Sequence, residues 1–205
     1  MYNPRHFETS DIAGMHALMR QHNFAILVTQ HGGAPFATHL PFLLDEARGP
    51  YGTLLAHLAR PNPQWHDLAA GGEALVIFQG AHAYISPSWY ASAPSVPTWN
   101  YSIVHAYGTA RIVDDRAELY AMMRRLVETH ESGFERPWRM DLPEDYMERM
   151  LRGVVGFELA ITRLEGKSKL SQNRDAADRA GVAAALSASA DPLAATVAAQ
   201  MQAEH

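Results

Sequence analysis

Short apolar runs separated by glycine, proline and polar residues fill much of the chain, and this pattern predicts more strand than helix. Phe24 to Thr29 is an apolar run rich in residues that favour strands. Phe36 to Leu44 is the expected returning strand, because His31-Gly32-Gly33 supplies a turn between them. Further extended segments are predicted at Thr53–Leu58, Trp99–Val113 with a bulge or bend at Gly108, Val154–Leu164, and a second hairpin of Ala74–Gln79 and Ala83–Ser86 about Gly80.

Helical periodicity is confined to the spaces between these runs and to the end of the chain. Residues 12–19 have a partly apolar face, and Ser10 or Asp11 can cap a helix there. Pro63 suits the first position of a short helix that ends near Leu68. Longer helices are predicted at Ala117–His130, at Pro143–Leu151 and in the Ala-rich end from Asp175, where Asp191-Pro192 separates two helices.

The order of these elements indicates the fold class. Strands do not alternate regularly with helices, which argues against a Rossmann sheet. A closed or nearly closed antiparallel barrel with peripheral helices, mainly β within the α+β class, fits the order better. We expect one domain over residues 1–174 and an Ala-rich helical extension over residues 175–205.

Composition and charge narrow the classes of function that this protein can have. The chain has 205 residues, 47% of them hydrophobic, which is enough for a substantial core. A formal net charge of -5 argues against a large basic surface for nucleic acid. There is no cysteine, so disulfides and thiolate chemistry are excluded. The chain start lacks a signal-peptide pattern, and no apolar run approaches the ~20 residues of a membrane span, so we expect a cytoplasmic protein without a membrane partner.

Four motifs gather aromatic, histidine, amide and arginine side chains near the ends of predicted strands. They are ATHLPF (37–42), HLARPNPQW (57–65), YISPSWY (84–90) and VPTWNYSIVHAYG (96–108). Arg60 is the strongest phosphate candidate, because it follows a strand and precedes the helix start at Asn62-Pro63-Gln64. No nucleotide-binding glycine motif, HExxH motif or nucleophile elbow occurs. The 11 histidines match no standard metal-ligand spacing, so no metal ligand is assigned.

With MYNPRHF and KLSQNR, these strings resemble the PaiB family of FMN-binding negative transcriptional regulators, and the resemblance spans residues 1–174. It implies an FMN-binding split barrel related to pyridoxamine-phosphate oxidases. It also implies a homodimer with two flavin sites at the interface. The implied cofactor-binding residues are Thr38, His39 and Leu40 on one strand, His57 and Leu58 at the end of another, Arg60, Asn62 and Gln64 at the phosphate, Trp99 and His105 near the ring, and Lys169 and Arg174, which reach the flavin of the other subunit.

The residues leave several activities open. No helix-turn-helix, zinc finger or basic recognition helix is visible, so DNA binding is possible for the family but is not indicated by these residues. A flavin-dependent oxidoreductase acting on a small molecule is the main alternative to a regulator, since flavin supplies redox chemistry itself. A haem-binding split barrel and a scaffold without ligand complete the alternatives. No catalytic residue is assigned.

Overall fold

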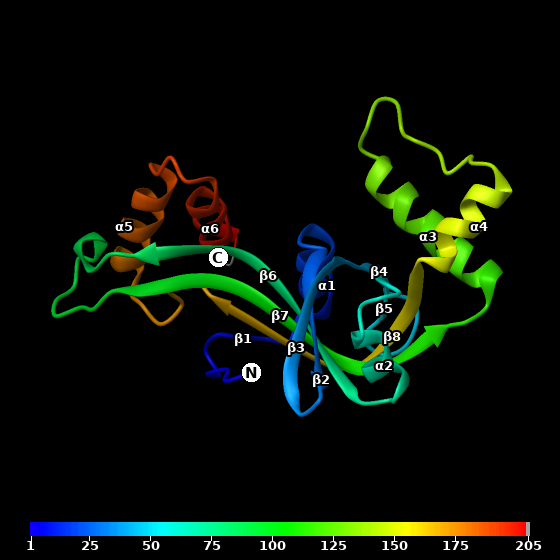
Figure 1. The fold of residues 1–205 in the computed structure, drawn as a ribbon. Coiled ribbons are helices and arrows are strands. Elements are labelled where there is room, and N and C mark those ends of the chain that lie inside the picture. Colours follow the sequence, from blue (N-terminus) through cyan, green and yellow to red (C-terminus); the bar gives the residue numbers. More distant parts are fainter. Residues whose placement is uncertain (204–205) are drawn as a thin grey trace. The chain divides into compact units, whose positions relative to one another are not determined.

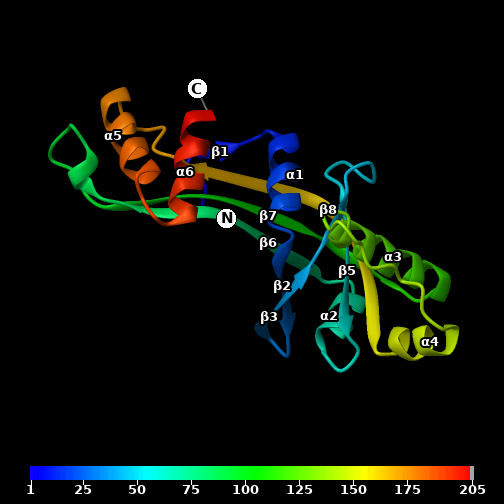
Figure 2. The same ribbon diagram turned by 90° about the horizontal axis from the view of Figure 1, so that it is seen from above.

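A computed structural model describes residues 1–203 of the chain. Figures 1 and 2 show its elements in two views, coloured from blue at the N-terminus to red at the C-terminus. In chain order they are β1 (Glu8–Thr9), α1 (Ile12–Gln21), β2 (Phe24–His31), β3 (Ala34–Pro41), β4 (Leu43–Asp45), β5 (Thr53–Ala59), α2 (Gln64–Ala69), β6 (Glu73–Ile85), the 3-10 turn η1 (Pro87–Trp89), β7 (Thr98–Val113), α3 (Arg116–Glu131), α4 (Glu144–Arg152), β8 (Val154–Lys169), α5 (Ala176–Ser187) and α6 (Pro192–Ala203).

Most of the strands join in one sheet with the order β3-β2-β6-β7-β8-β5-β4, and β1 pairs with β8. The β2–β3 hairpin is antiparallel from Phe24 opposite Pro41 to His31 opposite Ala34, as the sequence predicted. Gly32 and Gly33 both have positive φ, 58° and 84°, which glycine adopts without a steric penalty. The prediction of a mainly β, α+β protein is therefore confirmed.

The second predicted hairpin is wrong. Residues 73–85 form one continuous strand, β6, and the chain does not turn at Gly80. A Cβ at Gly80 would lie 3.0 Å from the Ser102 carbonyl oxygen and 3.3 Å from Leu18 Cδ1. This glycine therefore permits close packing inside a strand, a use that its sequence neighbours do not reveal.

The described residues form two compact units. Unit 1 contains residues 1–18, 79–105 and 165–203, and unit 2 contains residues 19–78 and 106–164. In unit 1 the Ala-rich helices α5 and α6 pack on β6 through a core that includes Ile85, Val182, Leu186 and Val197. The expected separation of these helices near Asp191-Pro192 is confirmed, whereas the domain boundary at residue 174 stays a prediction.

Unit 2 has its own core between its strands and the helices α3 and α4. Leu43, Val113, Leu126 and Leu151 belong to one buried cluster. A Cβ at Gly108 on β7 would lie 2.1 Å from the carbonyl oxygen of Ala160 on β8, so only glycine fits there without a backbone shift. No helix among residues 1–203 has the length and apolar character needed to cross a membrane.

Candidate functional site

Gln64 is the centre of a buried polar network in unit 2. Its side chain is fully buried, and Nε2 donates to the carbonyl oxygens of Leu27 and Phe36 at 3.3 and 3.1 Å and to Thr29 Oγ1 at 3.2 Å. Two of these three partners are carbonyls, which can only accept, so the amide nitrogen must face the hairpin. Gln64 thereby ties the start of α2 to both strands of the β2–β3 hairpin.

Asn62 extends this network toward the exposed edge strand β3. Its Nδ2 donates to Thr38 Oγ1 at 3.0 Å, and its Oδ1 accepts from the backbone N–H of Gln64 at 3.0 Å. The hydroxyl of Thr38 accepts this bond and can still donate its own proton outward. The structure thus brings three of the predicted site residues, Thr38, Asn62 and Gln64, into one hydrogen-bonded group.

The far side of the network contains residues that the sequence analysis missed. Thr29 Oγ1 donates to Asp67 Oδ2 at 2.9 Å, and His31 Nδ1 lies 2.9 Å from Asp67 Oδ1. Trp65 Nε1 donates to the carbonyl oxygen of Arg60 at 3.0 Å and so fixes the turn before α2. Trp65 stands in the HLARPNPQW motif, but no local signal links Thr29 or His31 to Asp67.

Arg60 is held by the turn between α4 and β8. Its Nε donates to the carbonyl oxygen of Arg152 at 2.8 Å, and Nη2 donates to that of Val154 at 2.9 Å. Its backbone N–H donates to the Gly153 carbonyl oxygen at 2.8 Å. Among residues 1–203, Nη1 has no hydrogen-bond partner, so the exposed end of an oriented guanidinium still carries two free donors.

Two histidines of the predicted site lie in unit 2 and differ in environment. His39 is exposed on β3, and its ring lies 6.4 Å from that of Phe24, which is itself 67% exposed. His57 on β5 is half-buried, and burial lowers the pKa of its imidazole. The Nδ1 atom of His57 is buried and has no hydrogen-bond partner among the described residues.

Leu40 and Leu58 stand beside these histidines in the sequence but face the core. Their side chains are 5% and 2% exposed. This is the ordinary consequence of side-chain alternation along β3 and β5, in which His39 and Leu40, or His57 and Leu58, point to opposite faces. Their predicted role therefore depends on their backbone atoms.

The other four predicted residues belong to unit 1. Trp99 is 52% exposed on β7, with its ring 5.9 Å from Tyr84 and 6.2 Å from His82. His105 is half-buried on the same strand. Arg174 lies with its guanidinium carbon 4.2 Å from the centre of the Tyr90 ring, a cation–π contact.

Lys169 is the last residue of β8. Its Nζ donates to Thr98 Oγ1 at 2.6 Å and to the carbonyl oxygen of Trp99 at 2.5 Å. Burial lowers the pKa of this ammonium group, and the nearby charges of Lys167 and Arg174 lower it further. Lys169 thus stabilises the start of β7.

Within unit 2 the structure joins Thr38, Asn62 and Gln64 by hydrogen bonds. We call this group, together with the predicted residues His39, His57 and Arg60 of the same unit, the β3–α2 site. Its polar atoms are hydroxyl, imidazole, amide and guanidinium groups. Among residues 1–203, no group of three or more histidine, aspartate or glutamate side chains is placed to hold a metal ion.

Comparison with known proteins identifies the family. The family model described as "Putative FMN-binding domain" matches residues 1–163. The chain is 37% identical over 179 residues to "Protease synthase and sporulation protein PAI 2" of Bacillus subtilis (strain 168), covering 87% of this chain and 85% of that protein. The chain belongs to this FMN-binding family, so the resemblance to the PaiB proteins and the assignment of FMN as the cofactor are confirmed.

Solved structures with low sequence identity share the fold. The flavocytochrome Anf3 from Azotobacter vinelandii has a TM-score of 0.61 at 15% identity, covering 85% of this chain and 75% of that chain. The FAD and heme binding protein from Mycobacterium smegmatis has a TM-score of 0.57 at 17% identity, covering 84% and 78%. The predicted split β-barrel fold is thereby confirmed.

Proposed function

We propose that this protein binds FMN at the β3–α2 site and acts as a PaiB-type regulator of gene expression. The observation that carries the location is Arg60, whose guanidinium is oriented by two backbone carbonyls while Nη1 keeps its donors. A guanidinium fixed in this way loses little conformational freedom when a phosphate binds. When bound, FMN would supply its own redox chemistry, and the protein would supply binding and orientation.

At the phosphate end, Arg60 would pair with the dianion and the Thr38 hydroxyl would donate a hydrogen bond. Asn62 holds the Thr38 hydroxyl in place through its Nδ2, and its own position is fixed by the backbone N–H of Gln64. A charged donor and a neutral donor, both held by further hydrogen bonds, are the kind of preorganised contact that phosphate recognition requires.

At the ring end, His39 and His57 are the candidates. The lowered pKa of His57 favours the neutral imidazole near pH 7, which can donate from one nitrogen and accept at the other. Its orphaned, buried Nδ1 is the kind of atom that gains most from a ligand partner, because an unpaired buried polar group costs free energy. An N–H or carbonyl group of the isoalloxazine edge would satisfy it.

The proposal includes a homodimer in the cytoplasm, with the flavin at the interface. Lys169 and Arg174 of one copy would then serve the flavin held by the other, as the family resemblance implies, and Trp99 and His105 would lie near a flavin ring. The support is the exposure of Trp99, a large aromatic side chain of the kind that enriches interfaces. Sedimentation at micromolar concentration would measure the state of assembly.

The regulatory part rests on the relative whose name concerns protease synthesis and sporulation. Regulation through direct DNA contact would give sequence-specific retention in a mobility-shift assay at physiological salt. Binding that disappears with a modest rise in salt would mean non-specific attraction. An oxidoreductase would instead show reduction of its bound flavin by NAD(P)H, and a haem protein would show a Soret band.

The experiment that tests the site is a titration of the Arg60→Ala variant with FMN, in which flavin fluorescence reports binding. We expect FMN affinity to fall by roughly 1.5–3 kcal/mol, the usual size of a charge-assisted hydrogen bond. Arg149→Ala is the matched control, since Arg149 is an exposed arginine of unit 2 that contacts Asp145 and Tyr146 within its own helix, α4. Unchanged affinity in Arg60→Ala, with a folded protein, removes Arg60 from the site.

A further inference from the structure

A pocket lies wholly within unit 1 and is lined by aromatic side chains. It has a volume of about 360 Å³, which is in the range of small-molecule sites. His82 and Tyr84 come from β6, Trp89 from η1 and Trp99 from β7. The opposite wall is formed by the end of α5 and the start of α6, including Asp191 and Leu193. We call this the aromatic pocket.

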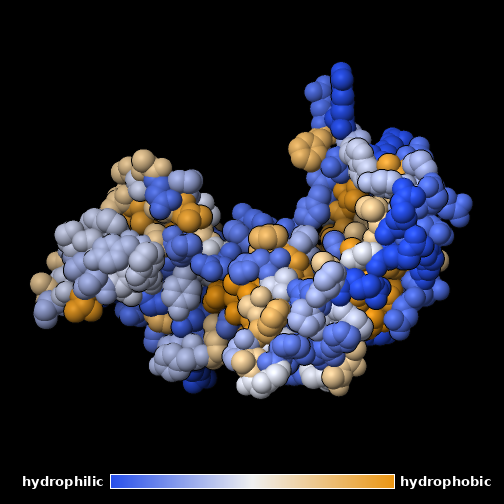
Figure 3. Space-filling model, in the orientation of Figure 1, coloured by the Kyte–Doolittle hydropathy of each residue, from blue (hydrophilic) through white to orange (hydrophobic). Residues whose placement is uncertain are grey.

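The aromatic pocket has a wall that the family match does not cover. The family model ends at residue 163, whereas the wall from α5 and α6 is built from residues 185–194. Hydrophobic residues reach the surface over α5 and α6 (Figure 3). FMN binding by the family therefore does not by itself account for this pocket.

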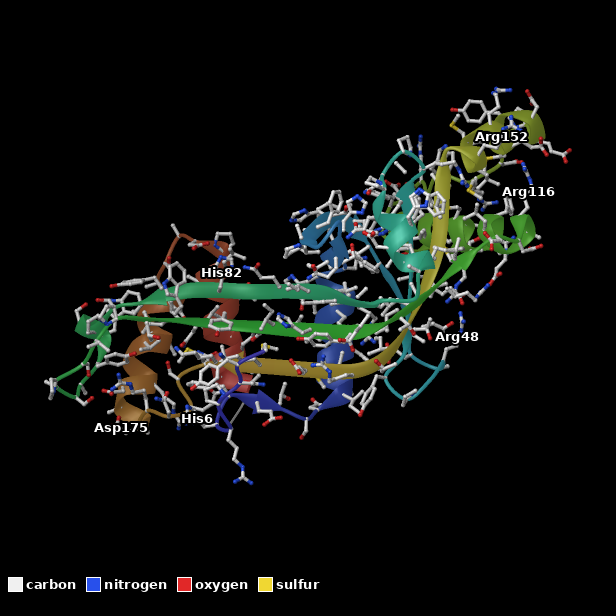
Figure 4. All side chains as sticks on the ribbon, turned by 60° about the horizontal axis from the view of Figure 1, so that its bottom comes forward. His6, Arg48, His82, Arg116, Arg152 and Asp175 are labelled. Carbon is white, nitrogen blue, oxygen red and sulfur yellow. The ribbon has the colours of Figure 1, made fainter. Side chains whose placement is uncertain are left out.

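The aromatic walls are held in place by packing. The backbone of Trp89 lies so close to α5 that a Cβ at Gly181 would be 2.2 Å from the Trp89 carbonyl oxygen. The Trp99 and Tyr84 rings meet edge to face, with an interplanar angle of 77°. His82 projects from β6 (Figure 4), with its ring 6.2 Å from that of Trp99. Rings fixed in this way need little further ordering when a ligand binds.

The charge of the lining residues is negative. Asp191 is the charged residue among the pocket's lining, which also includes His82. Asp191 Oδ1 accepts from the backbone N–H of Leu193 at 2.9 Å and so caps α6. The carboxylate offsets the partial positive charge of that helix start, and among the described residues its Oδ2 has no hydrogen-bond partner.

Aromatic faces together with one carboxylate are the chemistry that recognises an organic cation. We propose that the aromatic pocket binds a small alkylammonium compound, with the cation between the indole faces and Asp191 and the alkyl part against the alanine and leucine side chains of α5 and α6. An anion is disfavoured by Asp191, and a neutral apolar ligand would leave the carboxylate unused. Trp99, which the family resemblance places near a flavin ring, is the one lining residue that this pocket shares with the residues proposed for FMN.

The test uses choline as the probe and 3,3-dimethylbutan-1-ol, its neutral isostere, as the ligand control. Binding to the full-length protein is followed by NMR of the four tryptophan indole N–H groups, assigned with single Trp→Phe variants. We expect choline to shift the Trp89 and Trp99 signals and to leave Trp65 and Trp138, which lie in unit 2, unchanged. We expect the neutral isostere to bind roughly three- to tenfold more weakly.

Asp191→Asn is the decisive variant, because asparagine can still cap α6 while the charge is lost. We expect it to weaken choline binding by roughly three- to tenfold. Asp175→Asn is its matched control: Asp175 caps α5 through the backbone N–H of Asp178 and does not line the pocket (Figure 4). It should leave choline binding unchanged.

Three outcomes would overturn the proposal: no shift at Trp89 and Trp99, equal binding of choline and its isostere, or an unchanged affinity in Asp191→Asn. FMN affinity is measured on the same samples, and Asp191→Asn should not alter it. Displacement of FMN by choline would show that the pocket is part of the flavin site and would overturn the proposal. Failure of FMN binding alone would refute the proposed function and leave this result standing.

Discussion

Substitution of Gln64 tests the buried polar network that supports the β3–α2 site. Its Nε2 donates to three acceptors, and its Oε1 is buried without a partner. Gln64→Glu keeps the shape of the side chain but replaces the donor by a carboxylate oxygen that faces the same three acceptors. The two N–H donors of the amide, shared among these three acceptors and worth about 1 kcal/mol each, are lost, and a charge is buried without a partner. We expect the free energy of unfolding at pH 7 to fall by about 3–5 kcal/mol.

The pH dependence of this stability loss shows whether the buried charge of Gln64→Glu causes it. Burial and the surrounding acceptors should raise the folded-state pKa of the new carboxyl above its unfolded value of about 4.3. The penalty for burying the charge is therefore present above the folded-state pKa and disappears as the pH falls below about 4.3, where both states are protonated. The protonated carboxyl can also donate one hydrogen bond. We expect the difference from wild type to shrink by at least about 1 kcal/mol between pH 7 and pH 4.

Urea unfolding of wild type and variant at each pH measures this difference directly. Gln30→Glu is the control, since Gln30 is exposed on β2 and should change the stability by no more than about 0.5 kcal/mol. A Gln64→Glu protein that is less than 1 kcal/mol less stable at pH 7, or whose difference from wild type is constant with pH, would refute the orientation of Gln64 and the network built on it.

Two further predictions concern unit 2. Arg48 and Arg111 lower the pKa of the buried Glu158 carboxyl from its ordinary 4.5 to about 2. The stability from this shift, roughly 3 kcal/mol, is present above pH 4.5 and should be lost as the pH falls toward 2. Urea unfolding between pH 5 and pH 2 checks this, and Glu158→Gln should flatten the acid dependence. Gly108→Ala should destabilise the protein by about 1–3 kcal/mol, because its Cβ meets a backbone oxygen at 2.1 Å, whereas Gly72→Ala, with no atom within 4 Å, should not.

Local sequence signals predicted the elements that depend on local chemistry. The β2–β3 hairpin follows from two adjacent glycines, and the start of α2 follows from Pro63. Where packing with distant residues decides, the prediction failed. Gly80 resembles a turn residue but permits contact with Ser102, and β8 runs five residues past the predicted Leu164 because Lys167 and Gly166 pair with β1.

In the candidate site, too, local sequence signals predicted the local contacts, and contacts between distant residues were missed. The motif HLARPNPQW pointed to Arg60, Asn62 and Gln64, which the structure places in one turn and at one helix start. The sequence could not show that two N–H groups of Arg60 are used by the α4–β8 turn, since that contact joins residues 92 and 94 positions apart. For the same reason the Thr29–Asp67 link, 38 positions apart, was missed.

The most direct measurement is a visible absorption titration of the purified protein with FMN, with the bound flavin then released by heat and counted. We expect a shifted flavin band and about one FMN per chain, as for one preformed site. We also expect the band to return to that of free FMN when Arg60→Ala replaces the wild type at the same concentrations. No uptake of FMN by the folded wild-type protein would contradict the proposal that this chain binds FMN.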